Sequence, residues 1–260
     1  MLPIHGRCFG KVAFKEHCDF HQLKKLWATA ALEAFEATVR QECFPCFFGT
    51  RSVRSGSFEF LFISEQAPVT DFIAGLGNYI EQTTSWSMKL RIRKPLIILF
   101  ERNNFSSLAE EQRYAWRLLQ QLHDKDPAPW PESIPLDIYN EYWSFSFMGM
   151  PLFINMSFPG HQLMKSRNLG THIVFVINPR ENFDYVASGG SQKGQRIRAR
   201  IRSRSEAYNA GRVSGTLGAF GENGNLEIKH YQLEEPGSLS HAQCPFHMNL
   251  NPTAAKASIA

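Results

Sequence analysis

Three strand-like segments follow one another in the second half of the chain with little sequence between them. They cover residues 142–147, 152–158 and 171–177. A connection between parallel strands requires a crossover of a dozen or more residues, usually a helix, whereas antiparallel strands need only a short turn. The short connections therefore predict antiparallel pairing, and they restrict the chain to folds that contain a mostly antiparallel sheet.

Other parts of the chain supply helices and two further strands. Ser107 and Glu110 form a capping box, and apolar residues at helical spacing follow it. We expect helices over residues 21–41, 71–84 and 107–123, and strands over residues 58–64 and 90–100. The sequence thus predicts an α+β fold, in which one domain spanning residues 1–260 packs helices against a mostly antiparallel sheet. Residues 237–260 are polar and predict a flexible or extended tail.

Composition and charge exclude several classes of protein. No apolar run approaches the roughly 20 residues of a membrane-spanning helix, so we expect no membrane association. The N-terminal residues lack the pattern of a signal peptide, and five cysteines are an odd and sparse set. Reduced thiols and a cytoplasmic location fit these features. A net charge of +4 does not by itself indicate a nucleic-acid partner.

Two pairs of possible metal ligands are each spaced two residues apart. Cys43 and Cys46 form the first pair, and Cys244 and His247 form the second, so together they offer a Cys3His zinc set. The two pairs are far apart in the sequence, and each is rich in Phe and Pro. The alternative interpretation is a pair of buried, hydrophobic thiols and a separate polar tail.

An arginine-rich run covers residues 195–204. As a strand it would place its arginines on one face, and as a helix it would align Ile197, Ile201 and Tyr208. The helix is favoured. The arginines could form a solvated face, bind nucleic acid, or clamp the carboxylates or phosphates of a bound cofactor.

His161 begins the segment that follows a buried strand and Pro159-Gly160. Such a histidine is often an ordinary core or surface residue. Its apolar neighbours, among them Phe158 and Met164, would also suit an axial ligand of haem, whose flat ring needs apolar walls. Aromatic residues make up 13% of the chain, which allows such a pocket without requiring it.

Six short motifs, taken together, resemble those of the YqcI/YcgG family over about residues 40–250. They are Phe44-Pro-Cys-Phe-Phe-Gly49, Pro129-Trp-Pro131, Trp143-Ser-Phe-Ser-Phe147, Pro159-Gly-His161, Ser166-Arg-Asn-Leu-Gly170 and Asn178-Pro-Arg180. Characterised members of that family are haem-dependent N-oxygenases that hydroxylate a nitrogen of arginine or a related guanidine compound in natural-product biosynthesis. The resemblance therefore implies a haem b enzyme that uses dioxygen or peroxide and an electron donor.

The same resemblance implies roles for particular residues. His161 would be the iron ligand, with His247, Cys46 or Cys244 as alternatives. Arg167 and Arg180 would pair the haem propionates, because a guanidinium binds a carboxylate through two hydrogen bonds. Phe44 and Phe47 would wall the porphyrin. No oligomeric state is implied.

The substrate contacts rest on physical reasoning. A guanidinium substrate needs a carboxylate to offset its desolvation. Glu141 is our prediction, because it precedes the aromatic segment 142–147, and Trp143 would add a cation–π contact. Asp137 and Glu59 are the alternatives. Two non-catalytic functions also remain open, a haem-binding sensor and a basic nucleic-acid-binding protein.

Overall fold

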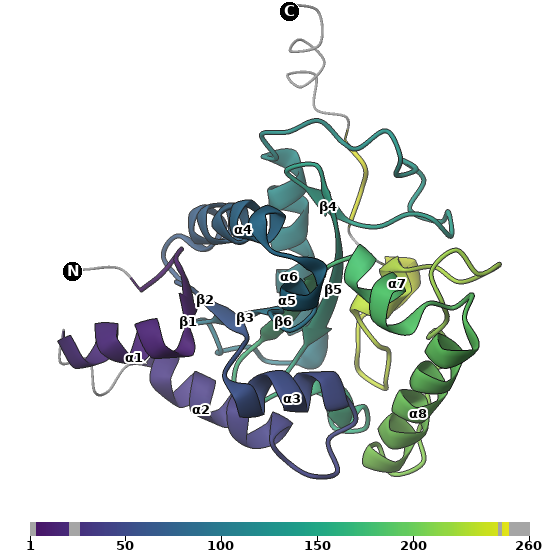
Figure 1. The fold of residues 1–260 in the computed structure, drawn as a ribbon, viewed down its shortest axis with the longest axis horizontal. Coiled ribbons are helices and arrows are strands. Elements are labelled where there is room, and N and C mark those ends of the chain that lie inside the picture. Colours follow the sequence, from purple (N-terminus) through teal and green to yellow (C-terminus); the bar gives the residue numbers. More distant parts are fainter. Residues whose placement is uncertain (1–3, 21–26, 244–245, 250–260) are drawn as a thin grey trace, which may run out of the picture.

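A six-stranded sheet forms the centre of the molecule (Figure 1). The computed structural model describes residues 4–20, 27–243 and 246–249. The strand order is β1-β2-β3-β6-β5-β4. The strands are β1 (Cys8–Gly10), β2 (Glu59–Ile63), β3 (Leu96–Phe100), β4 (Ser146–Phe147), β5 (Met150–Ser157) and β6 (Val174–Pro179). Only β2 and β3 pair in parallel, so the predicted mostly antiparallel sheet is confirmed for the described strands.

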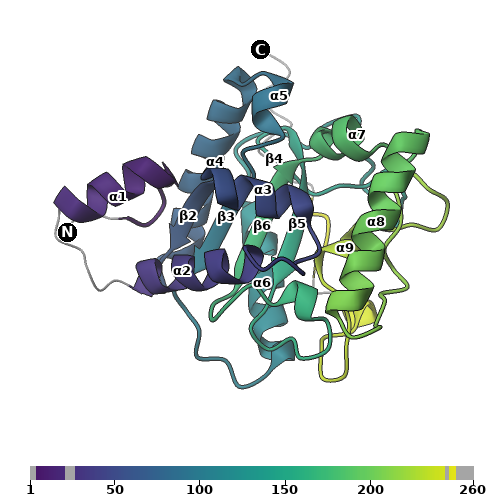
Figure 2. The same ribbon diagram turned by 60° about the horizontal axis from the view of Figure 1, so that its bottom comes forward.

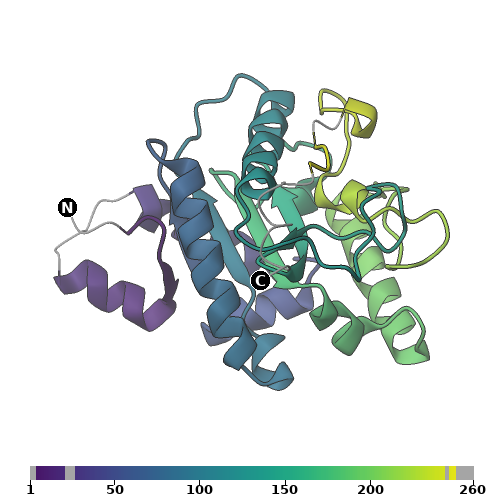
Figure 3. The ribbon, with the colours of Figure 1, turned by 90° about the horizontal axis from the view of Figure 1, so that it is seen from above.

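Helices surround this sheet and cover both of its faces. They are α1 (Lys11–Phe20), α2 (Trp27–Val39), α3 (Phe47–Ser55), α4 (Pro68–Ser85), α5 (Met88–Arg91), α6 (Leu108–Asp124), α7 (Glu181–Ala187), α8 (Gln192–Tyr208) and α9 (Ile228–Tyr231), with the short 3-10 helices η1 (Lys165–Arg167) and η2 (His241–Gln243). Figure 2 shows α2 and α3 in front of the sheet, and Figure 3 shows α4 and α6 on the opposite side. In Figure 2, α8 lies beside the β5 end of the sheet.

The central strands are apolar throughout because both of their faces are covered. Every residue of β2 and β3 is buried. Leu61 and Ile98 belong to the core on the α4 and α6 side, whereas Phe60 and Ile97 belong to the core on the α2 and α3 side. A continuous apolar run is therefore the pattern expected of strands sandwiched between two helical layers.

Two predicted strands are shorter than expected. Residues 90–95 were predicted to extend β3, but they form the end of α5 and a turn that leads to Pro95. Arg91, Arg93 and Lys94 lie there, and charged side chains are not buried in the middle of a two-faced sheet. Only residues 146–147 of the predicted strand 142–147 pair with a neighbour. The arginine-rich run forms α8, so its helical interpretation is confirmed.

Part of the predicted tail packs against α6. The backbone N–H of Leu239 donates to Gln112 Oε1 at 2.6 Å, and Phe246 is a buried member of the core beside Trp143. Apolar burial thus holds this part of the chain in place, while residues 250–260 lie outside the described residues. No helix in the described ranges is long and apolar enough to span a bilayer.

Two glycines in α4 give a test of how closely that helix packs on the sheet. Replacing a helical Gly by Ala normally stabilises by about 1 kcal/mol. A Cβ added at Gly75 would overlap the tip of Leu61, which is fully buried, so we expect Gly75→Ala to lower the free energy of unfolding by roughly 1–3 kcal/mol. A Cβ at Gly77 would meet only the flexible Met148 side chain, at 3.1 Å from its sulfur.

Urea unfolding of the two variants measures this difference. Gly77→Ala is the matched control, and it should match or exceed the wild type in stability. Equal stability of the two variants would contradict the close packing of α4 on β2.

Candidate functional site

A cavity of about 410 Å³ lies between the sheet and the helices α3, α7 and α8. Its floor includes Phe153 and Asn155 of β5 and Val176 and Asn178 of β6. Each pair is two residues apart on its strand, so both of its side chains point to the same face of the sheet. The volume falls within the range of about 300–1,000 Å³ that is typical of sites for cofactors and other small molecules.

The lining combines aromatic walls with an excess of positive charge. The aromatic residues of the wall are Phe35, Phe44, Phe48, Phe58, Phe153, Phe183 and Phe220. Five arginines and two glutamates occur among the described lining residues: Arg167, Arg180, Arg198, Arg202, Arg212, Glu206 and Glu227. This lining suits a flat, apolar ligand that carries negative charge.

Arg167 is a buried cation without a carboxylate partner in the described part of the chain. Its guanidinium donates to the backbone carbonyls of His230, at 2.8 Å, and Tyr231, at 3.3 Å. The residue is 6% exposed, and burial lowers the pKa of the guanidinium to about 10. Carbonyl groups offset only part of the cost of burying a charge, so an anionic group bound in the cavity would stabilise Arg167 further.

Arg180 reaches the same region from the other end of the β5–β6 pair. Its Nε lies 2.7 Å from Glu227 Oε2, and its guanidinium stacks 4.1 Å from the ring centre of Phe220. Glu227 is 2% exposed and accepts a hydrogen bond from Ser144 at 2.6 Å. Burial raises the pKa of Glu227 to about 7, although Arg180 acts against that shift. Arg167 and Arg180 thus hold α9 between them and line one cavity.

The arginines of α8 divide between the cavity and the solvent. Arg198 lines the cavity, and its Nε donates to the carbonyl of Ala187 at 2.6 Å. Arg202 also lines the cavity but is exposed, and Arg196 and Arg200 are exposed and lie outside the lining. This arrangement favours the anion-clamp interpretation for the inner arginines and leaves the solvated face to the others.

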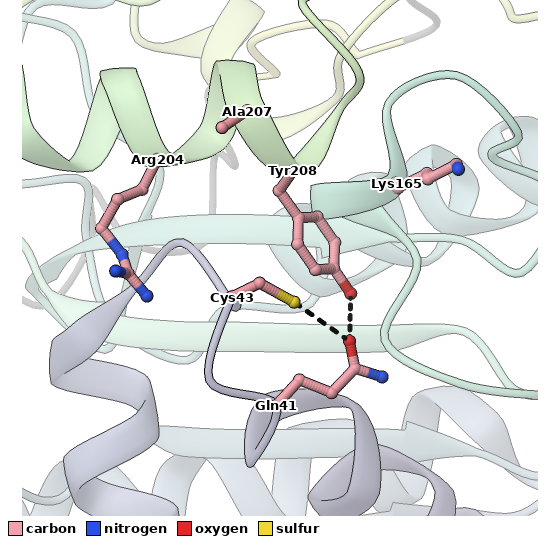
Figure 4. Close-up of a pocket in the computed structure, with 6 residues that line it drawn as sticks. All are labelled: Gln41, Cys43, Lys165, Arg204, Ala207 and Tyr208. Atoms are coloured by element: carbon pink, nitrogen blue, oxygen red, sulfur yellow. Dashed lines mark hydrogen bonds between the residues drawn. The ribbon is translucent and has the colours of Figure 1, made fainter.

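A second pocket lies between α8 and the loop after α2 (Figure 4). Its lining residues are Gln41, Cys43, Lys165, Arg204, Ala207 and Tyr208. Three of them, Cys43, Lys165 and Arg204, each precede a residue that lines the cavity. Tyr208 Oη donates to Gln41 Oε1 at 3.0 Å and so ties α8 to the loop after α2. The two pockets therefore meet where this loop contacts α8.

His161 does not line the cavity. Its side chain is fully buried, with Nδ1 2.9 Å from Glu235 Oε2, and its Nε2 has no hydrogen-bond partner among the described residues. Burial lowers the pKa of the imidazole although Glu235 acts against that shift. The structure therefore does not bring the predicted iron ligand to the cavity that holds Arg167 and Arg180.

The two aromatic residues predicted as porphyrin walls separate in the structure. Phe44 lines the cavity. Phe47, the first residue of α3, lies outside the lining, with its ring centre 4.5 Å from that of Phe48 and 5.7 Å from the guanidinium of Arg200. The neighbouring Phe48 takes the lining position, because successive residues of a helix point in different directions.

The predicted substrate contacts also lie outside the cavity. Trp143 is fully buried in the core on the α4 and α6 face of the sheet, where its ring contacts those of Trp130 and Phe246. Glu141 accepts a hydrogen bond from the backbone N–H of Gly224 at 3.1 Å, in a surface loop. The two alternative carboxylates have other partners. Glu59 pairs with Lys94, and Asp137 is exposed and accepts a hydrogen bond from the backbone N–H of Tyr139.

The predicted zinc ligands do not converge. Cys46 is next to α3 on one face of the sheet, whereas His247 hydrogen-bonds through its backbone to Gln120 of α6 on the other face. Cys244 lies outside the described residues. In the ranges that the structure describes, no cluster of three or more His, Cys, Asp or Glu side chains could hold a metal ion.

Three cavity residues were missed by sequence reasoning. Glu227 and His230 lie in a polar segment between short elements, where no periodic pattern marks a buried face. Asn182 is 4% exposed, and its Oδ1 has no hydrogen-bond partner among the described residues. Its place two residues after the motif Asn178-Pro-Arg180 was the only available signal.

Comparisons with known proteins identify relatives of nearly full length. The sequence model that describes the YqcI/YcgG family matches residues 35–247 of this chain. A Streptomyces lavendulae protein named "Putative N(omega)-hydroxy-L-arginine synthase DcsA" is 38% identical over 224 residues, which cover 85% of this chain and 84% of the relative. The uncharacterized protein YcgG of Bacillus subtilis (strain 168) is 28% identical, with 85% of this chain and 88% of the relative covered. No solved structure matches the chain significantly.

The buried imidazole of His230 predicts a loss of stability in acid. Burial and the positive charges of Arg167, Arg180 and Arg198 lower the pKa of His230 to about 4. The unfolded chain binds this proton near pH 6.5, so the contribution of His230 to stability is fully present above that pH and is lost as the pH falls through 4. The full effect corresponds to about 3 kcal/mol, at roughly 1.4 kcal/mol for each pKa unit.

Urea unfolding at pH 7, 6, 5 and 4 measures this loss. His230→Gln should show a shallower decline in stability than the wild type, with circular dichroism confirming that the variant is folded. Parallel declines in the two proteins would contradict the depressed pKa.

Proposed function

The chain belongs to the YqcI/YcgG family, and from this premise we propose that it N-hydroxylates the guanidine group of arginine or a related amino acid with haem b as its cofactor. The product is an intermediate in the biosynthesis of a small natural product. The 38% identical relative, whose name refers to N-hydroxy-arginine synthesis, supports the reaction. One observation supports the cofactor: the cavity joins aromatic walls to a buried Arg167 that lacks a carboxylate partner in the described ranges.

The cavity residues fit haem b in charge and polarity. Haem b is a flat, apolar ring with two ionised propionates. Arg167 and Arg180 would pair with the propionates, with Arg198 adding positive charge nearby, and Phe44 and Phe153 would contact the ring. When bound, haem supplies the iron centre that activates oxygen.

The reaction forms one N–O bond. If dioxygen is the oxidant, one oxygen atom enters the product, the other leaves as water, and an external donor supplies two electrons, with two protons from solvent. If hydrogen peroxide is the oxidant, it carries both the oxygen atom and the two oxidising equivalents, and water is the second product.

A cationic substrate requires acceptors within a positively charged cavity. Asn182 offers an unpaired, buried amide oxygen, which can accept a hydrogen bond from a guanidinium N–H. Glu227 is the buried carboxylate of the lining, and its ionised form, which also pairs with Arg180, offsets part of the substrate's charge. We therefore propose Asn182 and Glu227 as substrate contacts. Glu141 and Trp143 do not line the cavity and are no longer proposed for this role.

Incubation of the haem-loaded protein with arginine tests the activity itself. We expect N-hydroxyarginine, detected by mass spectrometry, either with dioxygen and a reducing system or with hydrogen peroxide. Homoarginine and other guanidine compounds are run in parallel. A haem-loaded protein that hydroxylates none of them would contradict the enzymatic function and favour a haem-binding sensor.

The propionate contacts predict which arginines retain haem. Arg167→Ala should release haem to an excess of apomyoglobin at least tenfold faster than the wild type, because a charge-assisted hydrogen bond contributes about 1.5–3 kcal/mol. Arg167→Lys should release it at an intermediate rate, since lysine keeps the charge but not the paired N–H groups.

Arg196→Ala is the matched control, because Arg196 belongs to the same arginine-rich run and is exposed. Arg204 was predicted to lie on a solvated face but cannot serve as this control, because it holds the loop before α3 through backbone carbonyls. Haem release at equal rates from the Arg167→Ala and Arg196→Ala variants would contradict the assignment of Arg167.

The substrate contacts predict which side chains control arginine affinity. Asn182→Ala should raise the apparent dissociation constant for arginine about tenfold, a loss of about 1.4 kcal/mol, while haem remains bound. The change in the haem absorption spectrum on addition of arginine measures this constant. Glu141→Gln is the control, and it should leave the affinity unchanged. A tenfold loss in Glu141→Gln with none in Asn182→Ala would reverse the assignment.

A further inference from the structure

Cys46 occupies a distinctive position in the wall of the cavity. It is the N-cap residue of α3, and its Sγ accepts a hydrogen bond from the backbone N–H of Gly49 at 3.4 Å. Burial raises the pKa of the Cys46 thiol, and the backbone N–H groups of Gly49 and Phe48 act against that shift. Cys46 is half-buried, carries a free thiol and lines the cavity. Among the described residues that line the cavity, Cys46 is therefore the one that carries a thiol, and a backbone N–H group donates to its sulfur.

The loop that carries Cys46 is held rigidly from α8. Arg204 donates to the carbonyls of Glu42 at 2.8 Å, Phe44 at 2.6 Å and Pro45 at 3.2 Å. Figure 4 shows its guanidinium extending from α8 toward the loop that bears Cys43. Thr50 Oγ1 also donates to the carbonyls of Val39 and Cys46 and so ties α3 to the end of α2. The position of the sulfur is therefore set by three elements of the fold.

Independent features indicate that a ligand belongs in this space. Asn182, across the lining on α7, is more than nine-tenths buried and has an amide oxygen without a partner in the described ranges. Arg167 is buried there with carbonyl partners alone. A cavity that holds an unsatisfied acceptor and an unneutralised cation is incompletely stabilised without an occupant.

The histidines near the cavity are less suited than Cys46 to bind a metal there. His161 lies outside the lining. His230 belongs to the lining, but its Nε2 is engaged by Asn225 Oδ1 at 2.7 Å and by the N–H of Gly218 at 3.3 Å. Cys46 needs no rearrangement, because its N–H contacts stabilise a sulfur anion and do not compete with a metal for it.

We propose that the sulfur of Cys46, as a thiolate, is the axial ligand of the haem iron. This inference rests on the proposed function, since it assigns the iron ligand of that cofactor. The N–H of Gly49 and the N-terminal end of α3 place partial positive charge beside the sulfur, which offsets part of the cost of a buried thiolate. A bound iron ion completes the deprotonation, because a coordinating thiol loses its proton. A thiolate ligand increases electron density on haem iron and favours O–O cleavage, which suits an oxygenase.

The carbon monoxide complex of the reduced, haem-loaded protein tests the ligand. We expect a Soret band at the long wavelength typical of thiolate ligation, and a low-spin thiolate signal in the electron paramagnetic resonance spectrum of the ferric protein. Cys46→Ser keeps a side-chain acceptor for the helix N-terminus and should lose both signals. Cys46→His should give the shorter-wavelength band of an imidazole complex. Circular dichroism verifies that the variants fold.

Cys43→Ser is the matched control, because Cys43 lies in the same loop but is exposed and does not line the cavity. It should retain both thiolate signals. A haem-loaded wild type with an imidazole-type band, or thiolate signals that survive in Cys46→Ser, would overturn this inference alone. A wild-type protein that binds no haem would overturn the cofactor assignment as well.

Discussion

The cavity depends on two guanidinium groups that hold α9 from opposite sides. Arg167 follows β5 and donates to the carbonyls of His230 and Tyr231, while Arg180 follows β6 and pairs with Glu227. Because β5 and β6 are antiparallel, these two arginines start from opposite ends of the strand pair. Their side chains converge on one short segment, which becomes the wall of the cavity facing the sheet.

Positive charge is concentrated in this wall at an energetic cost. A buried guanidinium with carbonyl partners alone is less well stabilised than one that faces a carboxylate. The cluster also lowers the pKa of His230 and keeps that imidazole neutral beside the arginines. In our proposal the propionates of haem compensate this charge.

The sequence predicted the fold better than it predicted the site. The antiparallel pairing of β4 with β5 follows from the two residues between them. Sixteen residues separate β5 from β6, which is enough for a crossover, so their predicted antiparallel pairing is confirmed without being required by chain length. Arg167 and Arg180, which the family resemblance singled out, both line the cavity, and their pairing with haem propionates stays a prediction. Trp143 could not be placed from its sequence, since an aromatic strand segment is compatible with either face of a sheet and Trp143 faces the α6 core.

Long-range contacts account for the other differences. The pairing of His161 with Glu235 joins residues 74 positions apart, and no local pattern anticipates it. The role of Arg204 depends on the loop before α3, which is 159–162 residues away in the sequence. The same contact places Cys46 in the wall of the cavity. The local sequence Phe-Pro-Cys does not reveal this contact, so the sequence could offer Cys46 only as one of several alternative iron ligands.

The visible absorption spectrum of the purified protein, titrated with haem, tests the central claim most directly. The account predicts a Soret band that saturates at one haem per chain and shifts when arginine is added, because both ligands occupy the same cavity. A protein that shows no saturable Soret band would contradict the account, since the arginine-lined cavity would then serve a different anionic ligand.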